Sequence, residues 1–141
     1  MKLSTKGRYA VMALADIAKF DPNLPISLRD ISIRQGISLN YLEQIFVKLK
    51  KNKIVISSRG VNGGYLLNRE PGEIKISDIL DAVDEKVKTI GCAKNSKKGC
   101  NGKSVKCITH NLWDELENYI NIFFNKKKLS DLLNQNNERQ I

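Results

Sequence analysis

Three cysteines and the only histidine lie close together in this chain of 141 residues. They are Cys92, Cys100, Cys107 and His110, separated by seven, six and two residues. Thiolates and an imidazole are ligands of zinc and of iron–sulfur clusters. Structural zinc sites usually combine two close pairs of ligands, whereas only the last two residues form a close pair here. The spacing therefore favours an iron–sulfur cluster and leaves a structural zinc ion as the alternative.

The stretch around these ligands, residues 86–106, is rich in Lys, Gly, Asn and Ser and has no regular period, which predicts a loop. Two ferric ions, two sulfides, three thiolates and a neutral imidazole sum to about −1. Five lysines of this stretch would offset that charge and favour the thiolate form of the cysteines. They are Lys94, Lys97, Lys98, Lys103 and Lys106.

Composition argues against several other classes of protein. An odd number of cysteines argues against a disulfide framework, and the start of the sequence lacks the apolar core of a signal peptide. We therefore expect a cytoplasmic protein, and no apolar run is long enough to predict a membrane span. Without a Cys-x-x-Cys pair, thiol catalysis is not predicted, so we do not expect an enzyme. An electron-transfer protein that uses the cluster chemically is the alternative from another class.

The elements that must position the ligands begin with three helices. A first amphipathic helix is capped by Ser4 or Thr5. Ser27 and Ser38 then cap two consecutive helices, and Gly36 supplies the turn between them. Two short helices joined by a glycine turn match the DNA-binding helix-turn-helix.

A hairpin is predicted after the third helix. Residues 54–58 and 65–67 read as strands around the glycine-rich tip 59–64, which is the order of a winged helix. Ser77 is expected to cap a fourth helix over residues 78–85. The N-terminal part of the chain is therefore predicted to be a winged helix-turn-helix domain.

A long helix is predicted to begin near Ile108. Its apolar residues step by four and form a stripe that a lone helix would expose, so we expect pairing with a second copy. These residues are Leu112, Leu116, Ile120 and Phe124, with Tyr119 and Phe123 one residue before the last two. The predicted fold class is mainly α, a winged helix-turn-helix with a long C-terminal dimerisation helix.

The distribution of charge favours a nucleic-acid partner. The chain has a net charge of +9, and residues 1–75 carry 13 Lys and Arg against 6 Asp and Glu. A basic half attracts DNA by releasing counterions. Lysines next to the third helix suit phosphate contacts, namely Lys48, Lys50, Lys51 and Lys53.

Polar side chains on the third helix are candidates for base reading. Gln44 can hold adenine through two hydrogen bonds, and Glu43 can accept a hydrogen bond from a cytosine amine. Ser38, Asn40 and Tyr41 lie at the helix start, where backbone amides also favour phosphate. At the tip of the hairpin, Arg59 is predicted to enter a narrow minor groove, where negative potential is concentrated.

Four stretches resemble the IscR-like family of iron–sulfur cluster assembly regulators, winged-helix proteins that also include the nitric-oxide sensor NsrR. They are LSTKGRYAV at 3–11, RQGISLNYLEQ at 34–44, RGVNGGYLL at 59–67 and CITHNLW at 107–113. The similarity extends from residue 2 to about residue 133, and the Cys-x-x-His-x-x-Trp stretch favours the IscR-like members. The chain departs from the pattern in a longer ligand loop, in Asn40 for a serine, and in Val61-Asn62 at the wing tip.

The resemblance implies a homodimer that binds double-stranded DNA and represses cluster-assembly genes when it carries a 2Fe–2S cluster. It assigns the cluster ligands to Cys92, Cys100, Cys107 and His110. It assigns the DNA contacts to Ser38, Asn40, Tyr41, Glu43, Gln44 and Arg59. Iron–sulfur assembly proteins are the implied cluster donors.

The predicted division of the chain follows from these assignments. It comprises a DNA-binding domain (1–85), a cluster-binding loop (86–110), a dimerisation helix with a final turn (111–133) and a disordered tail (134–141). Two alternative functions stay open. One is a nitric-oxide- or redox-sensing regulator of the same family, and the other is a winged-helix regulator with a structural zinc site.

Overall fold

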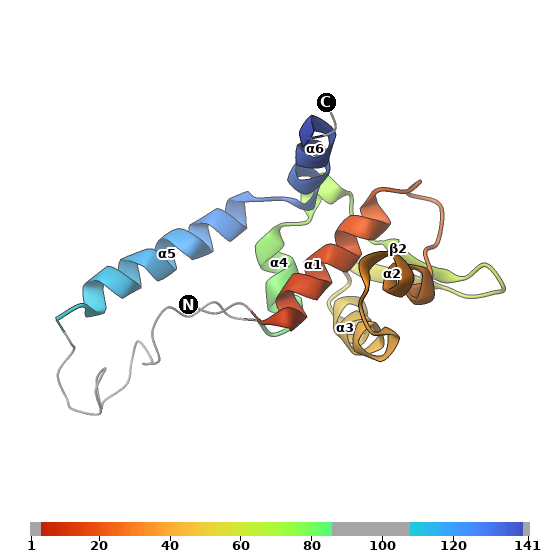
Figure 1. Ribbon diagram of the computed structural model, residues 1–141, viewed down its shortest axis with the longest axis horizontal. Coiled ribbons are helices and arrows are strands. Elements are labelled where there is room, and N and C mark those ends of the chain that lie inside the picture. The colour runs from red at the N-terminus through yellow and green to blue at the C-terminus, as the bar shows by residue number, and fades with distance from the viewer. Residues whose placement is uncertain (1–3, 86–107, 140–141) are drawn as a thin grey trace.

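The computed structural model describes residues 4–85 and 108–139, with side chains described through Asn134 (Figure 1). The elements in chain order are α1 (Thr5–Ala18), α2 (Leu28–Gln35), α3 (Leu39–Lys51), β1 (Val55–Ser58), β2 (Gly64–Leu67), the 3-10 turn η1 (Pro71–Glu73), α4 (Ile76–Ala82), α5 (His110–Lys126) and α6 (Leu129–Arg139). The predicted winged helix-turn-helix is confirmed, and α5 projects from this body as an arm. None of the helices in the described ranges is long and apolar enough to cross a bilayer.

The hydrophobic core lies where α1 contacts α2, α3 and α4. Each of these four helices contributes a fully buried large side chain, namely Leu14, Ile31, Phe46 and Ile79. The apolar faces predicted from helical periodicity are therefore the faces that pack. Packing of this kind, more than intrinsic propensity, keeps helices as short as α2 and α4 folded.

The helix-turn-helix has the caps that the sequence predicts. Ser27 Oγ accepts a hydrogen bond from the Asp30 amide at 3.1 Å, and Ser38 Oγ accepts one from the Tyr41 amide at 3.4 Å. Gly36 ends α2 with φ of 67°, a left-handed conformation that glycine adopts without strain. The turn between α2 and α3 is thus fixed at both sides.

The wing is an antiparallel pair of strands, with Ser58 opposite Gly64 at its outer end. The α1–α2 connection adds a third backbone pairing, because Ile26 and Tyr65 exchange amide-to-carbonyl hydrogen bonds of 3.0 and 2.8 Å. A Cβ on Gly64 would lie 2.4 Å from the Ile26 carbonyl, so only glycine permits this approach. The Tyr65 ring also contacts Phe46 of α3, with 4.9 Å between centroids. The wing is therefore held to the rest of the domain from two directions.

The fourth helix differs from the prediction at both ends. It begins at Ile76, because Ile76 is buried and Asp78 Oδ2 accepts a hydrogen bond from the Lys75 amide at 3.3 Å. Ser77 therefore lies inside the helix and does not cap it. The helix ends at Ala82, shortly before Asp84 adopts the left-handed conformation with φ of 59°.

The C-terminal part of the chain is more helical than predicted. In place of one turn and a disordered tail from residue 134, α6 continues to Arg139. The Asp131 carboxylate accepts a hydrogen bond from the Lys128 amide at 2.9 Å, and Leu129 is fully buried. A capped start and a buried anchor stabilise a helix whose later residues are mostly polar.

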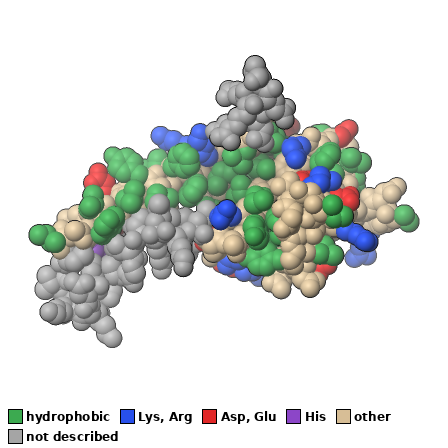
Figure 2. All heavy atoms as spheres, in the orientation of Figure 1, with side chains coloured by type: hydrophobic (Ala, Val, Ile, Leu, Met, Phe, Trp, Pro, Cys, Tyr) green, Lys and Arg blue, Asp and Glu red, His purple; other side chains and the backbone are tan. Residues whose placement is uncertain are grey.

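The α5 arm is joined to the body at its C-terminal end. The Ile76 amide donates to the Lys127 carbonyl and the Leu129 amide donates to the Ile74 carbonyl, both at 2.9 Å. Hydrophobic side chains line much of the arm's length (Figure 2). An exposed apolar stripe consists of Leu112, Leu116, Tyr119 and Phe123. Ile120 and Phe124 of the predicted stripe are instead half-buried, and Phe124 packs against the core.

Candidate nucleic-acid interface and cofactor ligands

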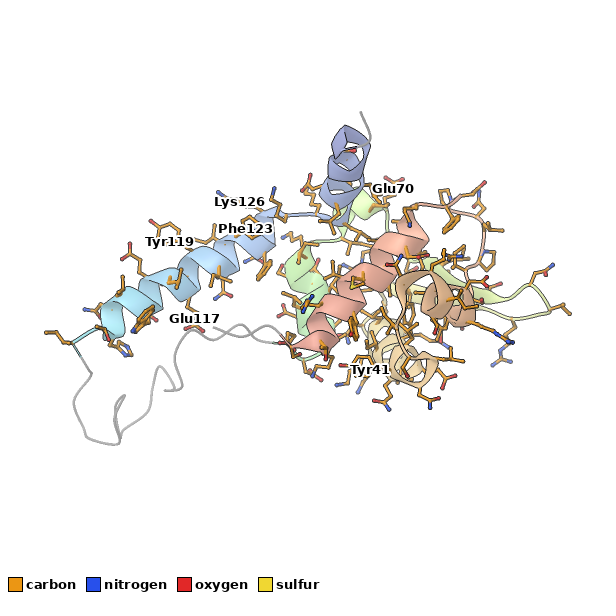
Figure 3. The ribbon with its side chains drawn as sticks, in the orientation of Figure 1. Tyr41, Glu70, Glu117, Tyr119, Phe123 and Lys126 are labelled. Carbon is orange, nitrogen blue, oxygen red and sulfur yellow. The ribbon has the colours of Figure 1, made fainter. Side chains whose placement is uncertain are left out.

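The predicted DNA-contacting residues of α3 are placed on its outer side, with one exception. Ser38, Asn40, Glu43 and Gln44 are exposed. Tyr41 is half-buried at the contact between α3 and α1 (Figure 3). Its ring meets the Tyr9 ring edge-on at 5.6 Å, and its hydroxyl lies 3.3 Å from that of Thr5. Tyr41 therefore anchors α3 to α1 through both its ring and its hydroxyl.

The orientation of α3 follows from its buried side. Leu42, Ile45, Phe46 and Leu49 face the core. A helix has 3.6 residues per turn, so the side chains opposite this face point away from the domain. Asn40, Gln44 and Lys51 belong to that outer side and are exposed. The domain thus presents an amide-rich, cationic helix surface of the kind that enters a major groove.

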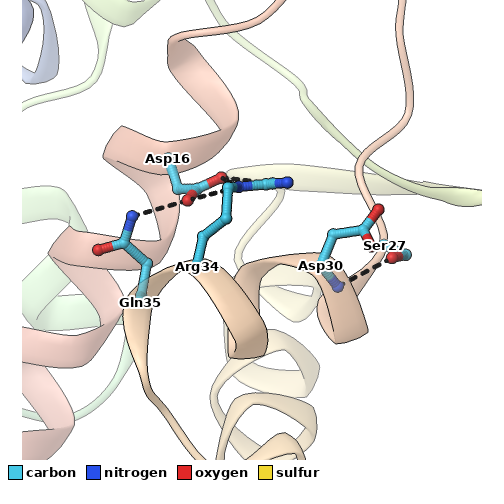
Figure 4. A network of polar contacts seen from close by, with 5 residues as sticks. All are labelled: Asp16, Ser27, Asp30, Arg34 and Gln35. Carbon is cyan, nitrogen blue, oxygen red and sulfur yellow. Dashed lines mark hydrogen bonds and ion pairs between the residues drawn. The ribbon is translucent and has the colours of Figure 1, made fainter.

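A buried carboxylate fixes the helix-turn-helix to α1 (Figure 4). Asp16, with its side chain fully buried, accepts hydrogen bonds from Arg34 Nη2 at 2.7 Å and from Gln35 Nε2 at 2.7 Å. Arg34 Nε lies 3.1 Å from both carboxylate oxygens, and its guanidinium stacks on the Phe20 ring at 4.7 Å. These contacts hold the last turn of α2 immediately before the turn that leads into α3.

The Asp16 carboxylate is stabilised in its charged form. Burial raises its pKa, but the hydrogen bonds from Arg34 and Gln35 and the charges of Arg34 and Lys19 outweigh this and leave the pKa below its ordinary value of 3.8. The same pairing raises the pKa of Arg34. Sequence reasoning did not assign these residues a role. In the sequence Asp16 lies outside the apolar face that contains Leu14 and Ile17, so helical periodicity gave no signal that it is buried.

Arg59 lies at the wing tip and is exposed, as predicted. The backbone around it requires glycine at two positions. Gly60 has φ of 123°, and a Cβ on Gly63 would lie 2.4 Å from the Ser58 carbonyl oxygen. The tip therefore bends tightly and leaves the Arg59 side chain free to reach beyond the strands.

The lysines predicted to contact phosphate are not equivalent. Lys50, Lys51 and Lys53 are exposed. Lys48 instead forms an ion pair of 3.1 Å with Asp84, directly after α4. A charge engaged in this way is less available to a phosphate group, so Asp84 opposes the contribution of Lys48.

Glu85, the next residue, connects the end of α4 to the start of α1. Its Oε1 accepts a hydrogen bond from the Ser4 amide at 2.8 Å, and its Oε2 accepts one from the Ser4 hydroxyl. Burial raises the pKa of Glu85, but these hydrogen bonds and the charge of Lys6 hold it below its ordinary value. Asp84 and Glu85 were expected inside a helix, and the sequence carried no signal for the contacts that they make.

Of the four predicted cofactor ligands, the structure places one. His110 is the first residue of α5 and is buried. Thr109 precedes it, and its hydroxyl accepts a hydrogen bond from Trp113 Nε1 at 3.1 Å. Cys92, Cys100 and Cys107 lie outside the described residues. Within the described ranges, no three metal-binding side chains come together.

The chain is similar to known transcription regulators along most of its length. Residues 3–135 match the Rrf2 family, described as iron-dependent transcriptional regulators. The HTH-type transcriptional regulator IscR of Cronobacter sakazakii is 47% identical over 134 residues, covering 95% of this chain and 81% of that protein. The solved structure of T. potens IscR is 35% identical, with a TM-score of 0.78 and coverage of 100% of this chain and 92% of that one. The B. subtilis global cysteine regulator CymR is 28% identical, with a TM-score of 0.77 and coverage of 94% and 95%.

Proposed function

The chain belongs to the Rrf2 family of iron-dependent transcriptional regulators, and from this premise we propose how it binds DNA and what it senses. It is a DNA-binding regulator and not an enzyme. Two copies bind one operator, with each α3 in a major groove and each wing directed at a minor groove. A 2Fe–2S cluster, supplied by iron–sulfur assembly proteins, controls this binding and thereby represses cluster-assembly genes.

The proposal assigns a task to each part of the chain. Residues 1–85 bind DNA, residues 86–110 hold the cluster and residues 111–133 form the dimer. The observation that carries the DNA-binding part is the outer surface of α3. It is exposed and mostly polar, and it belongs to a helix that the Asp16–Arg34 pair and the Phe46–Tyr65 contact hold in a fixed position.

Two substitutions on α3 separate base reading from phosphate contact. On an operator selected from a random DNA library, Gln44→Ala is expected to lower affinity by about 5- to 100-fold and to relax preference at one base pair. Lys51→Ala is expected to weaken binding to all DNA sequences about equally. It should also reduce the slope of log affinity against log salt concentration by about one. Fluorescence anisotropy at several salt concentrations measures both. Equal losses on operator and random DNA for Gln44→Ala would contradict the assignment of base reading.

The exposed stripe on α5 supports the homodimer. An apolar row of four large side chains on a projecting helix is a surface that a partner covers. Charge along α5 is segregated, with Asp114, Glu115 and Glu117 in the first half, Lys126 at the end, and Lys127 and Lys128 directly after it. Antiparallel pairing of two such helices places opposite charges together, whereas parallel pairing places like charges together.

The donor set supports a 2Fe–2S cluster. Cys92, Cys100, Cys107 and His110 supply three thiolates and one imidazole, a set that satisfies two iron atoms with two external ligands each. The nearby lysines offset the net charge of the loaded site. When bound, the cluster would supply a signal, because occupancy of the site depends on how much iron and sulfide are available.

Two residues link the cysteine-bearing segment to the DNA-binding helices. Asp84 and Glu85 directly precede residue 86, and they contact Lys48 of α3 and Ser4 at the start of α1. We expect a change in the segment that follows them to act on both helices through these contacts. This supports control of DNA binding by the state of the ligand-bearing segment.

The cluster is tested by protein purified without oxygen. Absorption between about 320 and 600 nm, with near-stoichiometric iron and sulfide, is expected for the wild-type chain. Cys107→Ala is expected to lose the absorption and to change which promoter fragments bind in an electrophoretic shift. Ser104→Ala, in the same segment, is the control and should retain both. A colourless protein that contains zinc, or a Cys107→Ala protein with unchanged cluster content and promoter choice, would contradict the proposal.

A further inference from the structure

One apolar side chain stands on the outer side of α3. Val47 is 65% exposed, whereas the other large apolar residues of this helix are buried or, in the case of Leu39, 38% exposed. A single exposed valine is ordinary on a protein surface. The functional argument for Val47 comes from the residues that lie beside it on the helix surface.

The flanks of α3 are distinguished by their contacts. On one flank, Tyr41 packs on Tyr9 of α1, and Lys48 pairs with Asp84 after α4. That flank therefore faces α1 and the end of α4. Opposite the core, α3 presents a row that holds Asn40, Gln44, Val47 and Lys51, spaced i, i+4, i+7 and i+11. All four of these residues are exposed.

Val47 therefore lies between the proposed base-reading amide of Gln44 and the cation of Lys51. Under the proposed function, on which this inference rests, that row lies in the major groove. The apolar feature of the major groove is the 5-methyl group of thymine. A valine has no hydrogen-bonding group for a base edge, but its two methyl groups pack well against that methyl.

We infer that Val47 contacts the 5-methyl group of a thymine and makes the operator sequence specific at that position. The Cα atoms of residues three apart along a helix are separated by about 4.5 Å in axial rise. Base pairs are stacked about 3.4 Å apart. The thymine read by Val47 is thus in the base pair next to the one read by Gln44.

The test replaces thymine by deoxyuridine, one position at a time, in the operator selected from a random library. This removes a methyl group and changes no hydrogen bond of the base pair. With wild-type protein, one position next to the Gln44-dependent base pair is expected to lose about fourfold in affinity, the value for burial of one methyl group. With Val47→Ala, the same replacement is expected to have no effect, and the variant itself should bind the thymine operator about fourfold more weakly.

Two further variants make the result specific. Ile33→Ala removes an exposed apolar side chain of α2, which is 73% exposed and outside the row, and should leave the deoxyuridine profile unchanged. Val47→Thr keeps the shape and replaces one methyl by a hydroxyl, so it should keep part of the sensitivity. Val47→Ala is not expected to impair folding, because the site is exposed and alanine favours helix.

The outcomes distinguish this inference from the proposed function. If Gln44→Ala weakens operator binding but the deoxyuridine profile of Val47→Ala equals that of the wild type, the role of Val47 is wrong and the DNA-binding proposal stands. If the wild-type protein shows no operator preference and no salt-dependent binding of DNA, both are wrong. Loss of sensitivity at a single thymine in Val47→Ala alone supports the contact.

Discussion

Asp16→Ala is expected to lower the free energy of unfolding by about 3 kcal/mol. The substitution removes a fully buried carboxylate that holds Arg34 and Gln35, and it leaves the Arg34 guanidinium without its ion-pair partner. Breaking a buried ion pair costs about 3–5 kcal/mol when the remaining charge has no access to water. Arg34 keeps 35% of its side chain exposed, which places the expected cost near the lower limit. Urea denaturation followed by circular dichroism measures the difference.

Controls isolate the pairing from loss of packing. Asp81→Ala removes an exposed carboxylate from α4 and should change stability by no more than about 0.5 kcal/mol. A double-mutant cycle with Arg34→Ala should give a coupling energy above about 1 kcal/mol. If the two single effects simply add, the ion pair does not stabilise the domain and the expected result is wrong.

The same experiment has a pH dependence with a definite sign. Because the pKa of Asp16 is lower in the folded protein than its ordinary value of 3.8, its contribution is fully present above that value. The contribution is lost as the pH falls through the lowered pKa. The stability difference between wild type and Asp16→Ala should therefore be constant from about pH 7 to 5 and shrink below about pH 4. The difference in stability between the two proteins does not contain the contribution of Glu85, whose pKa is also lowered, because both proteins carry that residue.

The second large effect is expected on α5. Tyr119 is 64% exposed and lies with Phe123 on one side of the arm (Figure 3). Tyr119→Glu places a charge in the middle of the apolar stripe, where a partner helix would bury it without a counterion. The variant is expected to be monomeric at micromolar concentration, as measured by sedimentation equilibrium. Its affinity for the full operator should fall by about 100-fold or more, because two half-sites no longer bind together.

A matched substitution on the same helix provides the control. Asn121 is exposed and lies on the side of α5 opposite to the stripe. Asn121→Glu introduces the same charge two residues away and should leave the dimer and operator affinity intact. A dimeric Tyr119→Glu protein would show that copies associate through another surface. Binding to an isolated half-site should be equal for all three proteins, since α3 is untouched.

Much of the fold was predictable because its signals are local. Ser27, Gly36 and Ser38 each determine a helix boundary through contacts within a few residues, and the structure has all three boundaries where the sequence predicts them. The errors have non-local causes. The start of α4 depends on burial of Ile76 and on a backbone pairing with Lys127, which no local pattern reveals.

The candidate site was predictable only in part. Exposed polar residues such as Asn40 and Gln44 follow from helical periodicity alone. Tyr41 has an ambiguous pattern, because an aromatic residue at a helix start can pack or bind, and here its ring packs on Tyr9. Asp16 and Val47 were missed for opposite reasons. Asp16 is a charged residue that is buried, and Val47 is an apolar residue that is exposed. Neither follows the usual pattern in which apolar residues are buried and charged residues are exposed.

The close approach of Gly64 to Ile26 limits how the wing can diversify. At Gly63 and Gly64 any side chain would collide with backbone atoms, and Gly60 has a backbone conformation that other residues adopt at a cost. A combinatorial library that aims to retarget the wing therefore gains nothing by randomising these positions. Within the tip, residues 59–64, useful variation is confined to Arg59, Val61 and Asn62. Evolution of new minor-groove preferences in this protein has the same three positions available.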